Sequence, residues 1–231
     1  QKRQQHPYDF KSRSTTKTRF LGSNLIKLCV FDFDSTLMDG ETIDFLAAAK
    51  GVGDEVSEIT AKAMAGELDF FESLTRRVSL LKGLELAKVD QICSNLPLMP
   101  GAAELIAHLK SKGVKVVVFS GGFHSGTDRA QEKLKFDASF ANILHHKDGI
   151  LTGLVGGEMM FGFSKGAMLA NLQNLLGISK EQTMSVGDGA NDLSMFEHSN
   201  LKIAFCAKQI LRQAATCCVD KKDLREIINL I

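Results

Sequence analysis

The chain has 231 residues, of which 44% are hydrophobic, and a formal net charge of +1. This length and composition fit one globular domain, or one domain with an insertion. Residues 1–24 hold six of the 28 Lys and Arg residues and one acidic residue, so residues 25–231 carry 22 basic and 26 acidic residues. By charge, this part of the chain is not a nucleic-acid binder. No apolar run reaches the ~18–20 residues that a membrane span needs, so we expect no membrane partner.

The first 24 residues differ in composition from the rest of the chain. They lack apolar periodicity and are rich in Lys, Arg, Ser, Thr and Gln. We interpret residues 1–24 as a disordered basic arm or as sequence added at cloning. A targeting peptide is a less favoured alternative, because Tyr8, Asp9 and Phe10 interrupt any amphipathic helix.

The cysteines indicate the cellular compartment. There are five of them, they show no Cys-x-x-Cys spacing, and most lie in apolar runs. This usage is typical of a reduced, cytoplasmic protein.

An apolar run at residues 25–31 leads into the sequence Asp32-Phe33-Asp34-Ser35-Thr36. Such a short run of β-forming residues predicts a buried strand. Side chains alternate along a strand, so Asp32 and Asp34 emerge on the same side where it ends. Unpaired carboxylates beside a core are costly unless a cation or a shared proton compensates them. The pattern therefore favours catalysis, although two turn-forming residues at a strand end would look the same.

The next segment contains helical periods and no convincing strand. Four helices are expected there, each ending in Gly or just before Pro97, at residues 41–50, 54–65, 70–81 and 85–96. We interpret residues 37–97 as a helical cap seated over the end of the first strand. The catalytic core would then consist of residues 25–36 and 98–231.

Strands and helices alternate after this insertion. We expect helices at 102–112, 124–134, 164–176 and 193–198, helical segments after Lys208 and Asp223, and strands at 114–119, 141–146, 150–155, 183–186 and 201–206. The two strands that flank Lys147-Asp148-Gly149 read as a hairpin. This alternation predicts an α/β fold: a doubly wound parallel, Rossmann-like sheet with helices on both faces.

Three of the predicted strands end in polar clusters. These clusters are Asp32 with Asp34, Ser120-Gly121-Gly122, and Asp188 with Asn191 and Asp192. In an open parallel sheet the ligand crevice lies outside the carboxyl ends of the strands, so we expect the clusters to converge. Carboxylate, hydroxyl and amide oxygens together are ligands that suit Mg²⁺.

An anion site is expected beside this metal site. The glycines after Ser120 let the backbone approach a ligand, and the following helix start offers N–H groups to an anion. Lys165 begins a helix, where the dipole disfavours a cation, so it needs an anionic partner. An anion pocket next to Mg²⁺ predicts phosphate chemistry. A ligand-free Gly-rich turn and a solvated surface Lys are the alternative readings of these residues.

Four ordered motifs resemble those of the haloacid dehalogenase superfamily of phosphotransferases. They are DFDST, SGG after the second strand, Lys165, and GDGAND. The longer strings DFDSTLMDGETID, RRVSLLKGL, VVFSGGF, GDGANDLSMF and LKIAFCAK are similar to the members of this superfamily that hydrolyse phosphoserine. The likeness runs from about Ile26 to the end of the chain.

This resemblance implies Mg²⁺-dependent hydrolysis of a small molecule, O-phospho-L-serine, to L-serine and phosphate, the last step of serine biosynthesis. Asp32 would be the nucleophile that forms an aspartyl-phosphate. Asp34 would protonate the leaving hydroxyl and then activate water, since acidic neighbours would raise its pKa. Mg²⁺ would be held by Asp32, the backbone carbonyl of Asp34 and Asp188, with Asp192 as support.

The resemblance also assigns the binding residues. The phosphoryl oxygens would be held by Ser120, Gly121, Lys165 and Asn191. Arg77 would pair with the substrate α-carboxylate and Glu41 with its α-ammonium, and the walls would be formed by Met64, Phe70 and Gly121. From the residues alone, Glu41 also reads as a first-turn acid and Arg77 as a solvated side chain.

Two other functions remain open on the sequence. The first is a related small-molecule phosphatase, or a phosphotransferase that passes the phosphoryl group to an acceptor such as homoserine. The second is a non-catalytic receiver-like module in which an Asp is only phosphorylated. A second carboxylate at Asp34 and the helices over the site disfavour the receiver.

Overall fold

The computed structural model describes residues 25–231, and the arm predicted for residues 1–24 lies outside these residues. Within the described part, one sheet contains the strands β1 (Leu28–Asp32), β2 (Lys115–Phe123), β3 (Ala138–Lys147), β4 (Ile150–Gly157), β5 (Thr183–Gly187), β6 (Leu201–Phe205) and β7 (Cys217–Val219). Their spatial order is β4-β3-β2-β1-β5-β6-β7. Neighbouring strands are parallel, except that β3 and β4 form an antiparallel hairpin.

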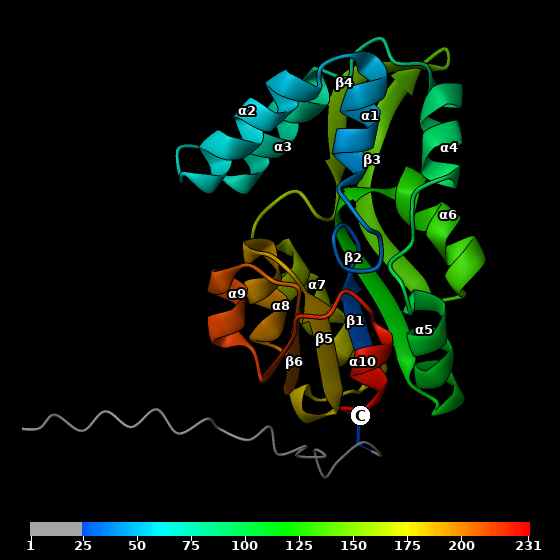
Figure 1. Cartoon of the computed structure of the whole chain (residues 1–231), viewed down its shortest axis with the longest axis vertical. Coiled ribbons are helices and arrows are strands. Elements are labelled where there is room, and N and C mark those ends of the chain that lie inside the picture. Colours follow the sequence, from blue (N-terminus) through cyan, green and yellow to red (C-terminus); the bar gives the residue numbers. More distant parts are fainter. Residues whose placement is uncertain (1–24) are drawn as a thin grey trace, which may run out of the picture.

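Helices cover both faces of this sheet (Figure 1). After the insertion they are α5 (Ala102–Ser111), α6 (His124–Leu134), α7 (Ser164–Leu176), α8 (Leu193–Phe196), α9 (Gln209–Ala214) and α10 (Arg225–Ile228). The predicted doubly wound α/β sheet is therefore confirmed. Among residues 25–231, every helix is too short or too polar to cross a lipid bilayer.

Alternation along β1 separates the core into two layers and aims Asp32. Phe31 packs in the larger apolar cluster with Leu105 of α5, whereas Val30 packs in a second cluster with Leu169 of α7. Burial on both faces explains why the strand reads as a continuous apolar run. Asp32 has the parity of Val30 and therefore emerges on the face that α7 covers.

The segment predicted as a cap, residues 37–97, contains the helices α1 (Thr42–Lys50), α2 (Gly53–Met64), α3 (Phe70–Ser79) and α4 (Leu86–Ser94), which we call the cap helices. The chain leaves and rejoins the sheet at one place, because Asp39 N–H donates to the Pro97 carbonyl (2.8 Å) and Met99 N–H donates to the Leu37 carbonyl (2.8 Å). Figure 1 shows α2 and α3 projecting over the side of the sheet that carries α8 and α9. The division into core and cap stays a prediction from the sequence.

The β3–β4 hairpin reaches farther than the sequence suggested. Both strands are longer than expected. The hairpin also accepts backbone hydrogen bonds from the cap segment: Gly83 N–H donates to the Leu151 carbonyl (2.9 Å) and Leu86 N–H donates to the Gly149 carbonyl (2.8 Å). The hairpin therefore supports the cap helices from the side.

One expectation about the strands was wrong, and one strand was not predicted. Ser120-Gly121-Gly122 does not follow the second strand but lies inside β2, where the pairing with β3 shifts register between Phe119 and Phe123. Glycines permit this irregularity because they tolerate a locally bent strand. Strand β7 was not predicted, because three residues at a sheet edge are too few to show a period.

Candidate active site

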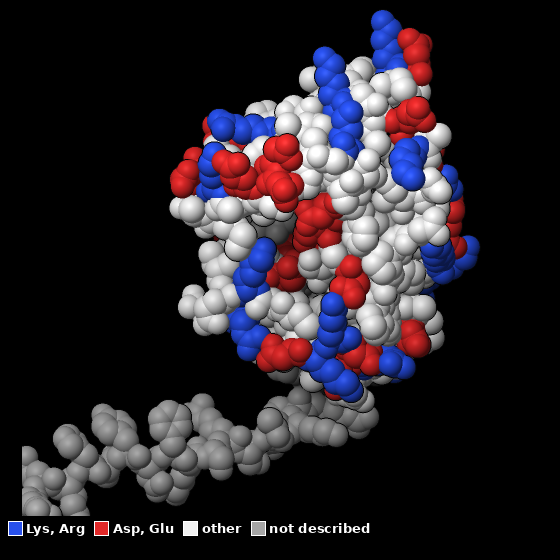
Figure 2. Space-filling model, turned by 45° about the horizontal axis from the view of Figure 1, so that its top comes forward, with Lys and Arg blue, Asp and Glu red and all other residues white. Residues whose placement is uncertain are grey.

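A cavity of about 660 Å³ lies between the cap helices and the carboxyl ends of the central strands. Its lining contains nine of the predicted site residues: Asp32, Asp34, Glu41, Met64, Phe70, Arg77, Gly121, Asp188 and Asn191. The other three, Ser120, Lys165 and Asp192, are buried. Figure 2 shows acidic side chains gathered at a hollow on this face of the molecule. The predicted convergence of distant loops is thus present in the fold.

Asp32 is the last residue of β1 and is 4% exposed. Its Oδ1 accepts hydrogen bonds from Lys165 Nζ (2.5 Å) and from Phe33 N–H (2.8 Å). Lys165 Nζ also donates to Asp192 Oδ1 (2.6 Å). Burial alone would lower the pKa of Lys165, but Asp192 and Asp32 raise it above its usual value, so the ammonium stays charged. The anionic partner that Lys165 needed is therefore a pair of carboxylates.

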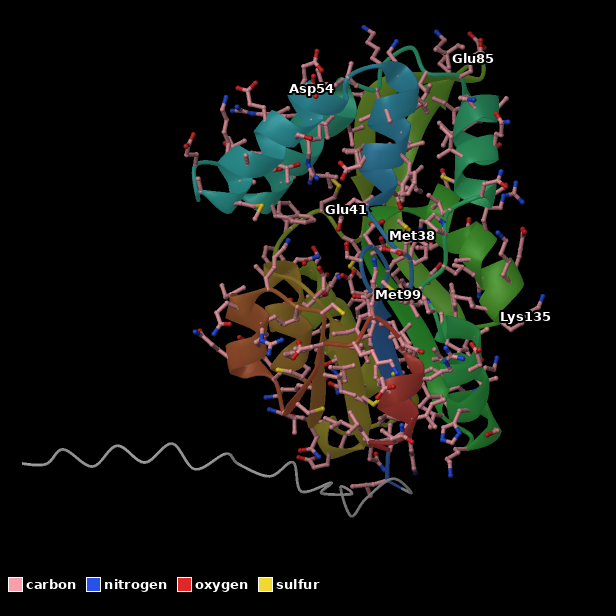
Figure 3. All side chains as sticks on the ribbon, in the orientation of Figure 1. Met38, Glu41, Asp54, Glu85, Met99 and Lys135 are labelled. Carbon is pink, nitrogen blue, oxygen red and sulfur yellow. The ribbon has the colours of Figure 1, made fainter. Side chains whose placement is uncertain are left out.

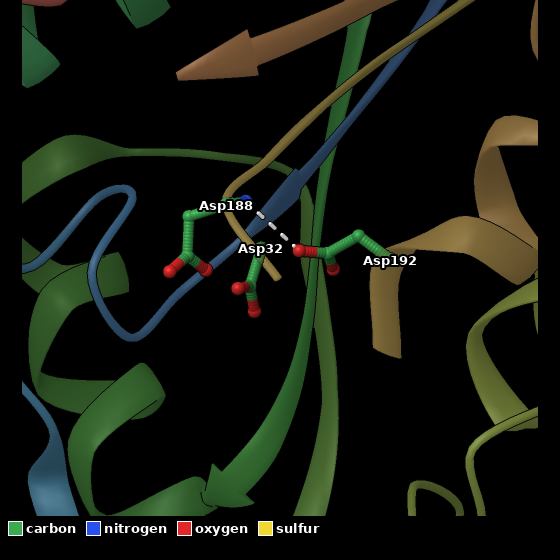
Figure 4. Close-up of side chains that lie close together, drawn as sticks. All are labelled: Asp32, Asp188 and Asp192. Carbon is green, nitrogen blue, oxygen red and sulfur yellow. Dashed lines mark hydrogen bonds between the residues drawn. The ribbon is translucent and has the colours of Figure 1, made fainter. Parts of the chain in front are cut away.

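The remaining oxygen of Asp192 is held by the backbone. Oδ2 accepts hydrogen bonds from Asp188 N–H (2.9 Å) and from Gly189 N–H (3.0 Å), and the first of these appears in Figure 4. Burial and the neighbouring Asp32 raise the pKa of Asp192 to about 6, although Lys165 opposes the shift. With both oxygens occupied, Asp192 fixes the loop that carries Asp188.

Asp188 is the least compensated carboxylate of this group. One ligand atom from each of Asp32, Asp188 and Asp192 lies within 4.8 Å of the others. Burial, followed by repulsion from Asp32 and Asp192, raises the pKa of Asp188 to about 9. Three close carboxylates share the charge of Lys165, so a divalent cation fits the donor set and would remove the excess negative charge.

Asp34 is held by the first residue of α1. Its Oδ1 accepts hydrogen bonds from Thr42 N–H (2.7 Å) and from Thr42 Oγ1–H (2.6 Å). Burial, followed by repulsion from Glu41, raises the pKa of Asp34 to about 8. At neutral pH this carboxyl group is mostly protonated and can act as an acid.

The other oxygen of Asp34 lies against a glycine. A Cβ on Gly122 would come within 2.6 Å of Asp34 Oδ2, so this position must lack a side chain. The contacts of Thr42 and Gly122 with Asp34 were not predicted from the sequence. A Thr at a predicted helix start was a signal for capping, but its acceptor lies eight residues earlier in the chain.

The cap helices contribute an aromatic ring and side chains of both charges to the wall of the cavity. The ring of Phe70 lies against strand β2, because a Cβ on Gly121 would lie 2.7 Å from Phe70 Cζ. Arg77 Nε donates to the Ser73 carbonyl (3.2 Å). Burial lowers the pKa of Arg77, while Glu41 and Asp44 raise it. Asp44 and Lys208 also line the cavity and were not predicted as site residues.

We expect Lys165→Met to lower the free energy of unfolding at pH 7 by about 3 to 5 kcal/mol, because it leaves Asp32 and Asp192 buried without their cation. Chemical denaturation without metal measures this loss, and Lys62→Met, in an exposed ion pair of α2, is the control, with a change within about 0.5 kcal/mol. The loss should shrink at pH 5, where carboxylates with raised pKa values become protonated and repel one another less. Wild-type stability in Lys165→Met would contradict the expectation.

The profile of haloacid dehalogenase-like hydrolases matches residues 26–200. The chain belongs to this family of hydrolases, and the resemblance noted in its motifs is confirmed. It is 63% identical to the phosphoserine phosphatase of Campylobacter jejuni subsp. doylei over 207 residues, which cover 90% of this chain and 100% of the relative. It is 50% identical to the phosphoserine phosphatase of Methanocaldococcus jannaschii over 205 residues, which cover 89% of this chain and 97% of the relative.

Solved structures support the same assignment. A structure described as a phospho-aspartyl intermediate analogue of phosphoserine phosphatase matches with a TM-score of 0.85 and 50% identity, over 89% of this chain and 99% of the other. A substrate-bound phosphoserine phosphatase matches with a TM-score of 0.85 and 49% identity, over 89% of this chain and 98% of the other.

Proposed function

We propose that this chain hydrolyses O-phospho-L-serine to L-serine and inorganic phosphate. One observation carries the proposal: a single cavity is lined by Asp32 and Asp34 and also by Glu41 and Arg77. The first pair suits phosphoryl transfer, and the second pair complements the ammonium and carboxylate of an amino acid. The relatives that share 50% or more of the sequence carry the name of this activity.

In the first step, an Asp32 oxygen attacks phosphorus. Because Oδ1 is hydrogen-bonded to Lys165 and Phe33, we assign the attack to Oδ2. The P–Oδ2 bond forms as the bond between phosphorus and the serine oxygen breaks, and Asp34 gives its proton to the departing oxygen. The products of this step are L-serine, an aspartyl-phosphate at Asp32 and an ionised Asp34.

In the second step, water attacks the same phosphorus atom. Asp34 takes a proton from the water, the P–Oδ2 bond of Asp32 breaks, and inorganic phosphate leaves with Asp34 protonated again. Two displacements replace one slow hydrolysis, which is the advantage of a covalent intermediate. Because Oδ1 of Asp34 accepts two hydrogen bonds from Thr42, we assign the transferred proton of Asp34 to Oδ2, the oxygen beside Gly122.

The phosphoryl group would be held by Ser120, Gly121, Lys165 and Asn191. Ser120 Oγ accepts a hydrogen bond from Gly122 N–H (2.9 Å), so its own proton is available for a phosphoryl oxygen. Lys165 already contacts Oδ1 of Asp32, which places a cation on the carboxylate whose other oxygen gains the phosphoryl group. Charge-assisted contacts of this kind favour the transition state of phosphoryl transfer.

The acidic cluster would hold Mg²⁺. We assign Asp32, the backbone carbonyl of Asp34 and Asp188 as its ligands, with Asp192 orienting the Asp188 loop. When bound, the metal neutralises charge so that an anionic phosphate approaches a carboxylate.

We expect Mg²⁺ to raise the melting temperature of the wild-type chain, because it binds the folded state and compensates its repelling carboxylates. At 100 times the dissociation constant such a ligand stabilises a protein by about 2.7 kcal/mol. Calorimetry with and without Mg²⁺ measures the shift, and a chelator should abolish phosphate release. Asp188→Asn is the matched variant: without metal it should melt at or above the wild-type temperature, and Mg²⁺ should shift it much less. Equal shifts in both proteins would remove Asp188 from the metal site.

A product assay tests the proposed activity directly. Phosphoserine is incubated with the chain and Mg²⁺, and L-serine and inorganic phosphate are quantified together. We expect equal amounts of L-serine and inorganic phosphate, and no new phosphoester when homoserine is added. Transfer of phosphate to homoserine would identify a phosphotransferase instead.

A further inference from the structure

Ser35, which is absent from the site assigned so far, has an unusual backbone next to Asp34. Its φ of 57° lies in the left-handed region. In the described part of the chain three other non-glycine residues share a positive φ, and they are Lys135, Asp148 and Cys206. Lys135 caps the end of α6 and Asp148 lies in the β3–β4 turn, where such angles are common. Left-handed geometry costs a residue with a Cβ about 1 kcal/mol or more, and it is often retained at functional sites.

The side chain of Ser35 makes a short contact across the loop. Ser35 Oγ–H donates to Glu41 Oε1 at 2.6 Å, and the backbone N–H of Ser35 donates to the Gly40 carbonyl at 2.9 Å. The left-handed turn therefore aims both donors of Ser35 at the start of α1. A hydrogen bond to a carboxylate is stronger than one between neutral groups.

The hydrogen bond from Ser35 orients the Glu41 side chain, which does not cap the helix. Glu41 occupies the N-cap position of α1, but its side chain makes no capping hydrogen bond. The Thr42 N–H that opens this helix donates to Asp34 Oδ1 instead. The carboxylate of Glu41 is therefore free of hydrogen bonds to α1 and lines the cavity. Figure 3 shows Glu41 at the start of α1, between this helix and the sheet.

Glu41 faces charges of both signs in the cavity, because Arg77 attracts its carboxylate whereas Asp34 and Asp188 repel it when they are ionised. Glu41 repels Asp34 and Asp188 and raises the pKa of both. These opposing interactions do not fix the rotamer of Glu41, whereas a short hydrogen bond to its carboxylate does. The Ser35 hydroxyl donates this bond, and it contacts one oxygen of Glu41, which leaves the other for a ligand.

We propose that Ser35 is a positioning residue for substrate selection, whose hydroxyl holds Glu41 where it meets the α-ammonium of the substrate. The inference rests on the proposed function, because it takes the ligand of Glu41 to be an amino-acid ammonium. The hydrogen bonds that Ser35 donates go to Glu41 and Gly40, and Ser35 is absent from the cavity lining. It acts through Glu41, and the left-handed backbone is what brings its hydroxyl within reach.

The test replaces the hydroxyl without disturbing the turn. Ser35→Gly removes the hydroxyl and relieves the left-handed strain, so the variant should melt at or above the wild-type temperature. We expect its KM for phosphoserine to rise about tenfold with little change in kcat, as for a lost hydrogen bond to a charged group. Ser35→Ala should give the same rise in KM although it keeps the strain. The control Lys135→Gly relieves the same kind of strain at the end of α6, outside the cavity lining, and should leave KM unchanged.

A matched substrate separates positioning from general damage. The phosphate ester of 3-hydroxypropionate lacks only the α-ammonium of phosphoserine, and both Ser35 variants should hydrolyse it as well as the wild type does. In a Glu41→Gln background, Ser35→Gly should change the KM for phosphoserine less than about twofold, because the two residues act in series. Equal losses on the two substrates, or a full tenfold effect in the Glu41→Gln background, would overturn the proposal.

Failure of the proposed function would look different. In that case the wild-type chain would not prefer phosphoserine to the ester without the ammonium. A clear wild-type preference that Ser35→Gly leaves intact would defeat the role of Ser35 alone.

Discussion

Asp32→Asn is expected to reduce phosphate release from phosphoserine by about 10⁴-fold or more, as when the nucleophile of a covalent mechanism is removed. An amide is a poor nucleophile toward phosphorus, so no covalent intermediate forms. Steady-state assays with Mg²⁺ measure the loss, and rapid quenching with labelled phosphoserine tests for phosphoenzyme. The wild type should show the acid-stable, hydroxylamine-sensitive label of an acyl phosphate, and the variant should show none.

The variant should fold, because Lys165 keeps its contact with Asp192 and the repulsion between Asp32 and Asp188 disappears. Its melting temperature without metal is the check. Asp128→Asn changes an exposed carboxylate of α6 and should leave both turnover and stability unchanged. Turnover by Asp32→Asn within tenfold of the wild type would show that another residue attacks phosphorus.

Arg77→Ala is expected to lower kcat/KM for phosphoserine by about 10²-fold or more, the scale of a truncated buried charge pair in a binding site. Hydrolysis of p-nitrophenyl phosphate, which has no carboxylate to pair, should change less than about threefold. The comparison of the two substrates in one variant is the measurement. It isolates recognition of the amino acid from phosphoryl transfer.

A neighbouring arginine provides the control for this substitution. Arg76 precedes Arg77 on α3 but is exposed, and it is absent from the cavity lining. Arg76→Ala should therefore leave both substrates within about threefold, as surface substitutions usually do. Equal losses on phosphoserine and p-nitrophenyl phosphate in Arg77→Ala would assign that residue to stability or phosphate binding and not to the carboxylate.

Local periodicity was sufficient to predict the fold and the position of the first acidic pair. The apolar run before Asp32 is buried on both faces of a central strand, so its composition identifies it directly. One topological rule, that loops at the carboxyl ends of parallel strands meet, was sufficient to bring Asp188 to Asp32. The roles of these residues in catalysis stay predictions from the family resemblance.

Contacts between distant segments were beyond the reach of the sequence. A charge argument indicated that Lys165 needs an anion, but Asp32, its partner, precedes it by 133 residues. The contact of Gly122 with Asp34 depends on the irregular pairing in β2, which no local pattern encodes. The bond from Ser35 to Glu41 requires a left-handed serine, and sequence propensities favour Gly or Asn at such a position.

The two hydrogen bonds that join residues 37–39 to residues 97–99 have a consequence for how such proteins diversify. The ends of the excursion between them are already held together, so lengthening it adds a loop-closure entropy that grows only with the logarithm of its length, about 0.6 kcal/mol per doubling. Helices can therefore be gained, lost or exchanged between these two joined ends at small thermodynamic cost. Substrate preference can change by replacement of one continuous stretch of gene, provided that the start of α1, whose Thr42 holds the general acid Asp34, is kept.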